Sequence, residues 1–203
     1  RALLVPILVT LWGVRLAGYI AWRSHGKDED YRYAAMRAAR GKSFTWLSLP
    51  TVFWLQAVLL WIVSMPLLQV QRVLEPRDLG GLDLLGLALF AVGLFFEAVG
   101  DFQMAFFKRD PANRGRVMDR GLWRYTRHPN YFGDAMVWWG FACLALATSG
   151  STWVLIGTAV MTVLLMRVSG VTLLEKGLSE SKPGYQDYVR RTSSFFPRPP
   201  RPR

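Results

Sequence analysis

Long apolar stretches alternate with short polar segments along the 203-residue chain. A helix needs about 20 predominantly apolar residues to cross about 30 Å of hydrocarbon, and five stretches approach this length. A transmembrane helix satisfies its own backbone hydrogen bonds, and no segment alternates like a barrel strand. The pattern predicts an all-α, polytopic transmembrane bundle with spans at Leu3–Trp22, Phe44–Leu68, Leu82–Phe107, Tyr131–Thr148 and Thr152–Leu174.

Basic residues are distributed unevenly among the segments between these spans. The connections at 23–43, 69–81, 108–130 and 149–151 contain six, two, seven and zero lysines and arginines, and the tail from Glu175 contains seven more. Cytoplasmic loops have the excess of basic residues in membrane proteins. We therefore predict a multi-pass protein of the bacterial inner membrane, with the first and third connections, the tail and any cofactor site facing the cytoplasm.

A single membrane-embedded domain is expected over residues 1–203. We assign residues 1–80 to the N-terminal, substrate-side part and residues 81–196 to a cofactor-binding part. The tail should begin as an amphipathic interfacial helix over Glu175–Tyr188 and end in a disordered, basic segment at 197–203, in contact with anionic headgroups.

Composition narrows the functional classes. The chain is 52% hydrophobic and has a net charge of +11, but apolar runs separate its basic segments, which argues against a nucleic-acid-binding domain. Cys143 is the single cysteine, so neither an internal disulfide nor a thiolate metal cluster can form, and with only two histidines no zinc site is expected. Membrane lipid is the expected surrounding of what we predict to be a monomer.

Ionisable side chains in the third span are candidates for function because unpaired charges are costly inside a membrane. Glu97 and Asp101 are four residues apart and Lys108 follows seven later, so all three lie on one helical face. Two interpretations stay open. The carboxylates accept hydrogen bonds from a ligand such as a carboxamide or a ribose, or they pair with arginines of a neighbouring span and hold the bundle together.

The densest polar motif is Gly121–Asp134, at the start of the fourth span. Pro129 can open a helix because its missing amide would be unpaired in a first turn, and Asn130 and Asp134 then share a face. His128 is interpreted either as an acid–base group or as a cap or second-layer donor. Guanidinium groups beside a helix N-terminus are typical of a phosphate site, and the motif supplies Arg120, Arg124 and Arg127.

Other polar residues fall within or beside the remaining spans. Arg167 and Glu175 are two helical turns apart and could line the same cavity from the fifth span. Gln56, in the second span, is either a hydrogen-bonding contact between helices or a cavity residue. We assign Gln56 and Arg15, in the first span, to a substrate cavity.

The motif Gly121–Asp134 resembles the cofactor-site motif of the steroid 5α-reductase family and its bacterial relatives, the domain of unknown function numbered 1295. Further matches extend the resemblance over nearly the whole chain, at Leu11–Ala17, Glu29–Tyr33, Leu173–Lys176, Gly184–Tyr188 and Thr192. The resemblance implies a membrane reductase with NADPH bound in a cytoplasm-facing cavity among the C-terminal helices.

The resemblance also implies roles for individual residues. Asp101 and Lys108 match an aspartate and a basic residue that contact the cofactor, and Arg32 and Tyr33 loosely match a loop that covers the nucleotide. Two departures are Asp134, where the family usually has glutamate, and the five spans, where the animal enzymes have seven, so a further pair is expected before Arg1. The full set of expected cofactor contacts is Arg32, Tyr33, Glu97, Asp101, Lys108, Arg120, Arg124, Tyr125, Arg127, His128, Asn130, Tyr131, Asp134, Arg167 and Glu175.

The expected reaction is NADPH-dependent reduction of the C=C bond of an α,β-unsaturated 3-oxo-steroid or a similar lipophilic enone, with the carbonyl-polarising residue unassigned. A methyltransferase similar to the isoprenylcysteine carboxyl methyltransferases is the alternative. Those enzymes share an Arg-His-Pro-x-Tyr element, present here at 127–131, but have two adjacent glutamates where this chain has Glu175 and Lys176. A non-enzymatic scaffold or transporter subunit is the third class considered.

Overall fold

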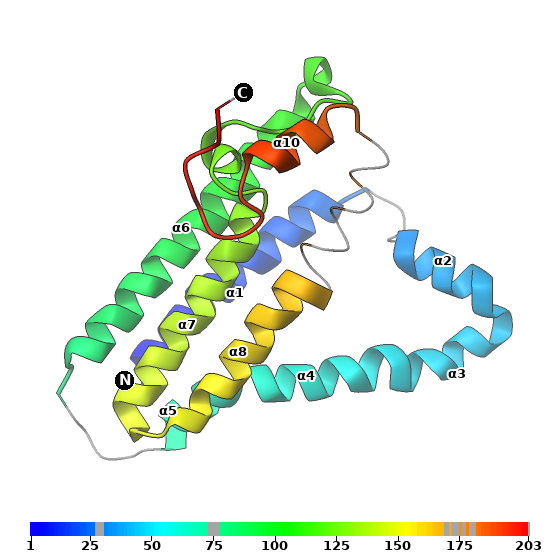
Figure 1. Cartoon of the computed structure of the whole chain (residues 1–203). Coiled ribbons are helices and arrows are strands. Elements are labelled where there is room, and N and C mark those ends of the chain that lie inside the picture. The colour runs from blue at the N-terminus through cyan, green and yellow to red at the C-terminus, as the bar shows by residue number, and fades with distance from the viewer. Residues whose placement is uncertain are drawn as a thin grey trace.

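The computed structural model describes residues 1–26, 31–72, 78–168, 171, 175, 178 and 182–202, without the side chains of residues 31, 32 and 168. Helices dominate this part of the chain, in which the single β-type contact is an isolated bridge between Thr126 and Ser193. The prediction of an all-helical bundle is therefore confirmed. Figure 1 shows α7 between α6 and α8, with α1 behind them.

The helices follow one another with few long connections. The first half of the chain contains α1 (Leu4–Ser24), α2 (Tyr31–Arg40), η1 (Gly41–Ser43), α3 (Phe44–Ser48), η2 (Leu49–Trp54), α4 (Leu55–Val63) and α5 (Met65–Arg72). The second half contains α6 (Gly81–Arg109), η3 (Pro111–Asn113), η4 (Gly121–Arg124), α7 (Pro129–Ser149), η5 (Thr152–Val154), α8 (Leu155–Val163), η6 (Leu164–Val168) and α10 (Tyr185–Arg191).

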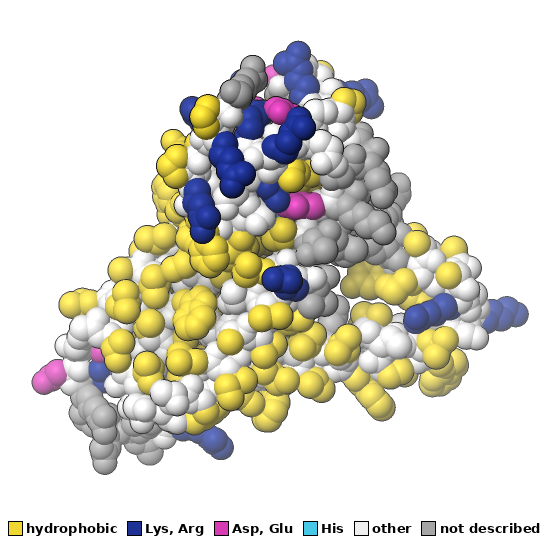
Figure 2. Space-filling model, viewed as in Figure 1, with side chains coloured by type: hydrophobic (Ala, Val, Ile, Leu, Met, Phe, Trp, Pro, Cys, Tyr) yellow, Lys and Arg dark blue, Asp and Glu magenta, His cyan; other side chains and the backbone are white. Residues whose placement is uncertain are grey.

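Three helices of the described chain are long and apolar enough to cross a membrane, at Leu4–Ser24, Tyr33–Val63 and Gly81–Arg109. A shorter apolar helix covers Thr152–Arg167, and α7 has 21 residues. Many large apolar side chains of these helices are exposed, and Figure 2 shows them over the body of the molecule, with lysines and arginines gathered at the end that contains α10. Such a surface suits lipid contact. The membrane orientation and the bacterial inner membrane stay predictions.

Two predicted spans have different limits in the structure. The span predicted at Phe44–Leu68 is wrong at both ends, because the helix starts earlier, at Tyr33, and stops at Val63. Ser64 ends α4, and Pro66 sits in the first turn of α5, where a proline lacks only an amide that would be unpaired. The chain therefore breaks at Ser64 instead of continuing to Leu68. The predicted span Thr152–Leu174 changes from α8 into the π-helical turn η6, and its end lies outside the described residues.

The helix predicted over Glu175–Tyr188 is only partly covered by the described residues: Glu175 and Leu178 are helical, and residues 176, 177 and 179–181 lie outside the described part. Helix α10 begins at Tyr185, after Pro183 and after Gly184 at φ +80°, a left-handed conformation that glycine adopts easily. The segment at 197–202, predicted to be disordered, returns to the body of the molecule. Within it the Arg198 amide donates to the Tyr125 carbonyl at 3.0 Å.

Glycines allow α6 and α7 to pack with their backbones in close contact. They recur every seven residues, at Gly86, Gly93 and Gly100 in α6 and at Gly133 and Gly140 in α7. A Cβ atom at Gly93 would lie 2.6 Å from the Gly133 carbonyl oxygen, and one at Gly86 would lie 2.9 Å from that of Gly140. Small residues at such spacing are typical of tightly packed membrane helices. This packing fixes the relative positions of the polar side chains that both helices present.

Candidate functional site

A buried ionic cluster joins α1 and α6. The Arg15 guanidinium of α1 donates to Glu97 and to Asp101 of α6, each at 2.7 Å. The Trp12 indole, one turn before Arg15, donates to the Glu97 carboxylate at 3.0 Å. The side chains of Glu97 and Asp101 are only 4% and 11% exposed, so their charges depend on these donors.

Helix α7 adds a third wall to this cluster. Pro129 opens the helix, as the sequence predicted, and places Asn130 in its first turn. The Asn130 amide approaches Asp101 with a nitrogen–oxygen distance of 3.5 Å. The structure thus brings together Glu97 and Asp101 of the third predicted span with Asn130 of the motif Gly121–Asp134.

Two buried polar atoms of α7 lack hydrogen bonds to the described residues. These are Oδ1 of Asp134 and Nε1 of Trp138, one helical turn further along. One atom is an acceptor and the other is a donor. The Trp138 indole is directed toward the Asp134 carboxylate, so a small polar group of a ligand could gain hydrogen bonds here by binding between the two side chains.

This ionic cluster contains more acidic than basic side chains. Glu97, Asp101 and Asp134 provide three carboxylates, whereas the Arg15 guanidinium provides one positive charge to the cluster. Buried carboxylates are costly without compensation. The cluster is therefore better matched to a proton, a hydrogen-bond donor or a cationic ligand group than to an anion.

A second polar cluster surrounds Arg127, at the start of α7. Its guanidinium binds Glu175 in a bidentate pair, with nitrogen–oxygen distances of 2.8 and 3.0 Å. It also donates to the carbonyls of Val189 and Thr192. Four of the five guanidinium N–H groups are thus used by the protein itself. Arg127 thus connects the start of α7 to the C-terminal segment. Its predicted contact with a phosphate stays a prediction.

His128 belongs to the same cluster. Its Nε2 lies 3.1 Å from Glu175, and its ring stacks on Tyr131 with 5.4 Å between the ring centroids. His128 is the N-cap residue of α7, although its side chain makes no capping hydrogen bond and contacts Glu175 instead. Burial alone would raise the pKa of Glu175, but hydrogen bonds from His128 and Arg127 outweigh burial and lower this pKa below its ordinary value.

The motif at 121–128 is also the docking site of the C-terminal segment. The Arg127 amide donates to the Ser193 carbonyl and the Thr126 hydroxyl donates to the Phe195 carbonyl, both at 2.8 Å. The Tyr188 hydroxyl donates to the carbonyl of Trp123, whose indole donates to the Gly100 carbonyl of α6 at 3.0 Å. The C-terminal segment thereby packs against the residues that precede the N-terminus of α7.

Other predicted site residues lie away from the two clusters. Gln56 is exposed on α4 in the described chain, so the structure supports neither a contact between helices nor a cavity position for it. The side chain of Arg32 lies outside the described residues, and Tyr33 is half-buried on α2. The side chains that are exposed at the surface are Lys108, Arg120, Arg124, Tyr125 and Arg167.

Sequence reasoning missed two members of the buried cluster. Trp12 was not predicted, and Arg15 was assigned to a substrate cavity, whereas the structure places it between Glu97 and Asp101. The available signal was an arginine in the middle of an apolar span, since such a charge needs a partner inside the bundle. The pairing of the third span with an arginine of a neighbouring span was one of the two open interpretations, and the contact supports it.

The fold and the buried cluster define a helical membrane protein whose polar side chains converge from three helices. A family model described as a protein of unknown function, DUF1295, matches residues 1–192, and the chain belongs to this family. The family is related to the steroid 5α-reductases.

Two curated relatives extend the comparison. An uncharacterised protein of Schizosaccharomyces pombe is 27% identical over 225 residues, which cover 98% of this chain and 64% of the relative. A probable O-methyltransferase, UstE of Ustilaginoidea virens, is 42% identical over 65 residues, covering 32% of this chain and 22% of the relative. The chain thus spans less than two thirds of the length of these relatives. No solved structure matches it.

Proposed function

We propose that the chain is an NADPH-dependent reductase that saturates the C=C bond of a lipophilic enone, such as a 3-oxo-steroid. The observation on which this rests is the convergence of Arg15, Glu97, Asp101 and Asn130 from three helices into one buried polar cluster. Membership of a family related to the steroid 5α-reductases supports the same reaction class.

The residues at the cluster fit the carboxamide end of NADPH. A primary carboxamide has both an acceptor and donors, which complement Oδ1 of Asp134 and Nε1 of Trp138. Asn130 and Asp101 offer further polar groups one turn away. Arg15 would hold the carboxylates of Glu97 and Asp101 in place, so that the polar groups need little rearrangement on binding.

In the proposed reaction NADPH would supply a hydride to the β-carbon of the enone, and a proton that comes ultimately from water would add to the α-carbon, which completes saturation of the C=C bond. The protein binds the carboxamide, keeps the acidic side chains oriented and excludes water from the reacting atoms. Apolar side chains exposed on the helices suit a lipophilic substrate that enters from the bilayer.

A methyltransferase is the second candidate, and two observations favour it. One is the 42% identity over 65 residues with a probable O-methyltransferase. The other is the excess of carboxylates over guanidinium in the buried cluster, which suits the positively charged sulfonium of S-adenosylmethionine. Electrostatic attraction to carboxylates would hold such a cation.

Cofactor retention by the purified protein separates the two candidates. The protein is extracted in mild detergent, and bound small molecules are identified by absorbance and mass spectrometry. Retained NADPH and enone reduction on adding substrate are the expected results. Retained S-adenosylmethionine would favour the methyltransferase, and retention of neither cofactor after supplementation would contradict both candidates.

A matched pair of amide variants tests the position of the cofactor. Asn130→Ala is expected to weaken NADPH binding by about 1–3 kcal/mol, the usual effect of deleting a buried polar partner. Gln56→Ala removes the same group from the exposed face of α4 and should leave binding unchanged. Equal affinities of the two variants, measured by fluorescence titration, would show that the cofactor binds elsewhere.

A further inference from the structure

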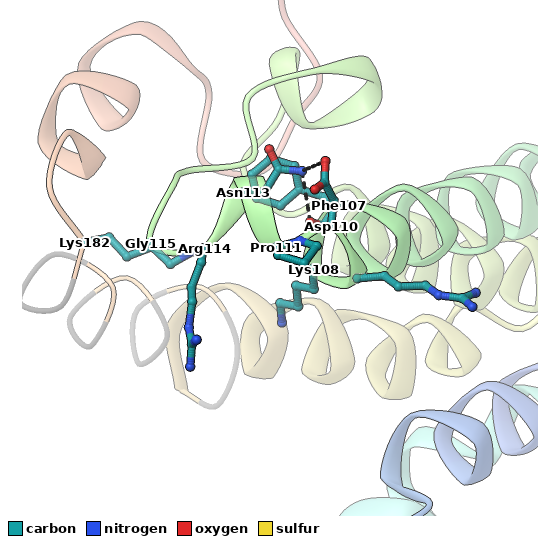
Figure 3. Close-up of a pocket in the computed structure, with 9 residues that line it drawn as sticks. Phe107, Lys108, Asp110, Pro111, Asn113, Arg114, Gly115 and Lys182 are labelled. Carbon is teal, nitrogen blue, oxygen red and sulfur yellow. Dashed lines mark hydrogen bonds between the residues drawn. The ribbon is translucent and has the colours of Figure 1, made fainter.

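A second, basic pocket lies at the C-terminal end of α6, separate from the buried cluster. It has a volume of about 390 Å³ and combines the end of α6 with the turn at 111–115 and with Lys182. Figure 3 shows Lys108 and Arg114 extending in the same direction from this turn, with the Lys182 side chain reaching toward Gly115.

The charge of the pocket is strongly positive. Four basic residues line it, whereas its one acidic residue, Asp110, is engaged in the turn. The Asp110 carboxylate accepts from the Ala112 amide at 2.9 Å and from the Asn113 side chain at 3.3 Å. The four basic residues are Lys108, Arg109, Arg114 and Lys182.

Two distant segments hold the pocket in shape. The Lys182 ammonium donates to the Arg116 carbonyl at 2.8 Å, which joins the C-terminal segment to the turn. The Asn113 amide donates to the Phe107 carbonyl at 3.1 Å and closes the end of α6. Gly115, at φ +78°, turns the chain in a conformation that few other residues adopt. The basic groups are therefore arranged by tertiary contacts.

The position of the pocket indicates what kind of anion it would bind. Helix α6 is one of the three helices that can cross a membrane, and the pocket lies where this helix ends. Phe102 and Phe106, one to two turns earlier, are 61% and 53% exposed, and their ring centroids are 4.2 Å apart. An exposed apolar surface one to two turns before a basic pocket on the same helix matches a molecule with acyl chains and an anionic head.

From these observations we propose that the pocket binds the phosphate headgroup of an anionic phospholipid, whose acyl chains lie along Phe102 and Phe106. The site is distinct from the buried cluster and does not depend on the reductase activity. Lipid bound there would anchor the end of α6 and the turn at 111–115 to the membrane surface.

Lipid titration of the purified chain tests this site. In phosphatidylcholine nanodiscs, added phosphatidylglycerol should raise the thermal unfolding midpoint, while added phosphatidylcholine should not. The double substitution Arg114→Gln and Lys182→Gln should weaken phosphatidylglycerol binding about 30-fold, since each basic group near anionic lipid contributes about fivefold. Lys108 is kept because it is also a predicted cofactor contact.

The control removes two charges from the same end of the molecule but outside the pocket. Arg190→Gln with Arg198→Gln should keep the affinity within about threefold of the unmodified chain, because these exposed groups only add to the screened surface field. Equal losses in both double variants would overturn the proposal. Arg114→Lys with Lys182→Arg should keep lipid binding, which distinguishes loss of charge from misfolding.

Two soluble competitors separate the lipid from other phosphates. Inorganic phosphate and NADPH should not displace phosphatidylglycerol, and the glutamine double variant should retain NADPH. Displacement by NADPH, together with loss of NADPH retention in that variant, would make the pocket a nucleotide site and would overturn the lipid assignment. Failure of the reductase assay alone would leave these results unchanged.

Discussion

Arg15 joins the polar residues of the first and third spans, and its contacts show how single side chains define the candidate site. It forms ion pairs with Glu97 and Asp101, while Asn130 approaches Asp101 from α7. Truncating Arg15 would leave the buried carboxylates of Glu97 and Asp101 without their cationic partner. The cluster is therefore sensitive to substitution whichever ligand it binds.

Glu175 is the residue whose charge controls the second cluster. Its lowered pKa means that the folded state binds the Glu175 proton more weakly than the unfolded state. The stabilisation by Arg127 and His128 is thus fully present above the ordinary pKa of 4.5 and is lost as the pH falls through the lower, folded value. Thermal unfolding in detergent between pH 3 and pH 7, a range of about four units, should show this loss.

Substitution of Glu175 should remove this pH dependence. Glu175→Gln is expected to lower the unfolding midpoint at neutral pH and to approach the unmodified chain at acid pH, where Glu175 is protonated. Asp187→Asn is the control, because Asp187 pairs at the surface with the exposed Arg190 and the partly buried Arg191, and such surface pairs contribute at most about 1 kcal/mol. A constant difference between Glu175→Gln and the unmodified chain at every pH would contradict the assignment.

At the scale of helices, the contact between α6 and α7 sets the positions of the side chains in both polar clusters. Its glycine spacing lets the two backbones approach closely, so Glu97 faces α7 and Gly133 faces Glu97. A Cβ atom at Gly133 would lie 2.9 Å from Cγ of Glu97. A change in the separation of these helices would therefore move the carboxylate as well as the backbone.

A pair of glycine substitutions tests this contact. Gly93→Ala would bring a Cβ atom to 2.6 Å from the Gly133 carbonyl oxygen, so the helices must separate, at a cost of about 1–3 kcal/mol for overpacking. Gly13→Ala, in α1, meets no atom within 4 Å and should be neutral or slightly stabilising, since alanine favours helix. Similar unfolding midpoints for the two variants would contradict the proposed role of the glycines.

Helical periodicity explains which parts of the site could be predicted. Glu97 and Asp101 share a face by spacing alone, and Pro129 marks the start of α7, so their positions followed from local rules. The hydrogen-bond partners of Glu97 and Asp101 could not be predicted from local rules, because the rotation and order of packed helices depend on contacts between distant segments. The pair of Arg127 with Glu175 spans 48 residues and has no local signal. The glycine repeat was a signal in the sequence that could have placed α7 against α6.

For the whole molecule, the C-terminal segment supplies the contacts that bury the motif at 121–128. The segment contributes main-chain acceptors to Thr126 and Arg127, and Thr126 is fully buried. The C-terminal segment is thereby connected to α6, because the same motif also contacts α6 through Trp123 and Gly100. A substitution that destabilises the C-terminal segment, the motif at 121–128 or the α6–α7 contact should therefore destabilise the other two as well.

Two truncations test this connection. Deletion of residues 193–203 removes the acceptors of the Thr126 hydroxyl and the Arg127 amide, each loss costing about 1–3 kcal/mol when a buried donor is left unpaired. Deletion of residues 199–203 leaves both acceptors in place and should lower the unfolding midpoint much less. The longer deletion should also weaken cofactor retention, because the first turn of α7 contains Asn130 and follows directly on the loosened motif. If both truncated chains unfold at the same temperature and retain equal amounts of cofactor, the C-terminal segment does not support the site.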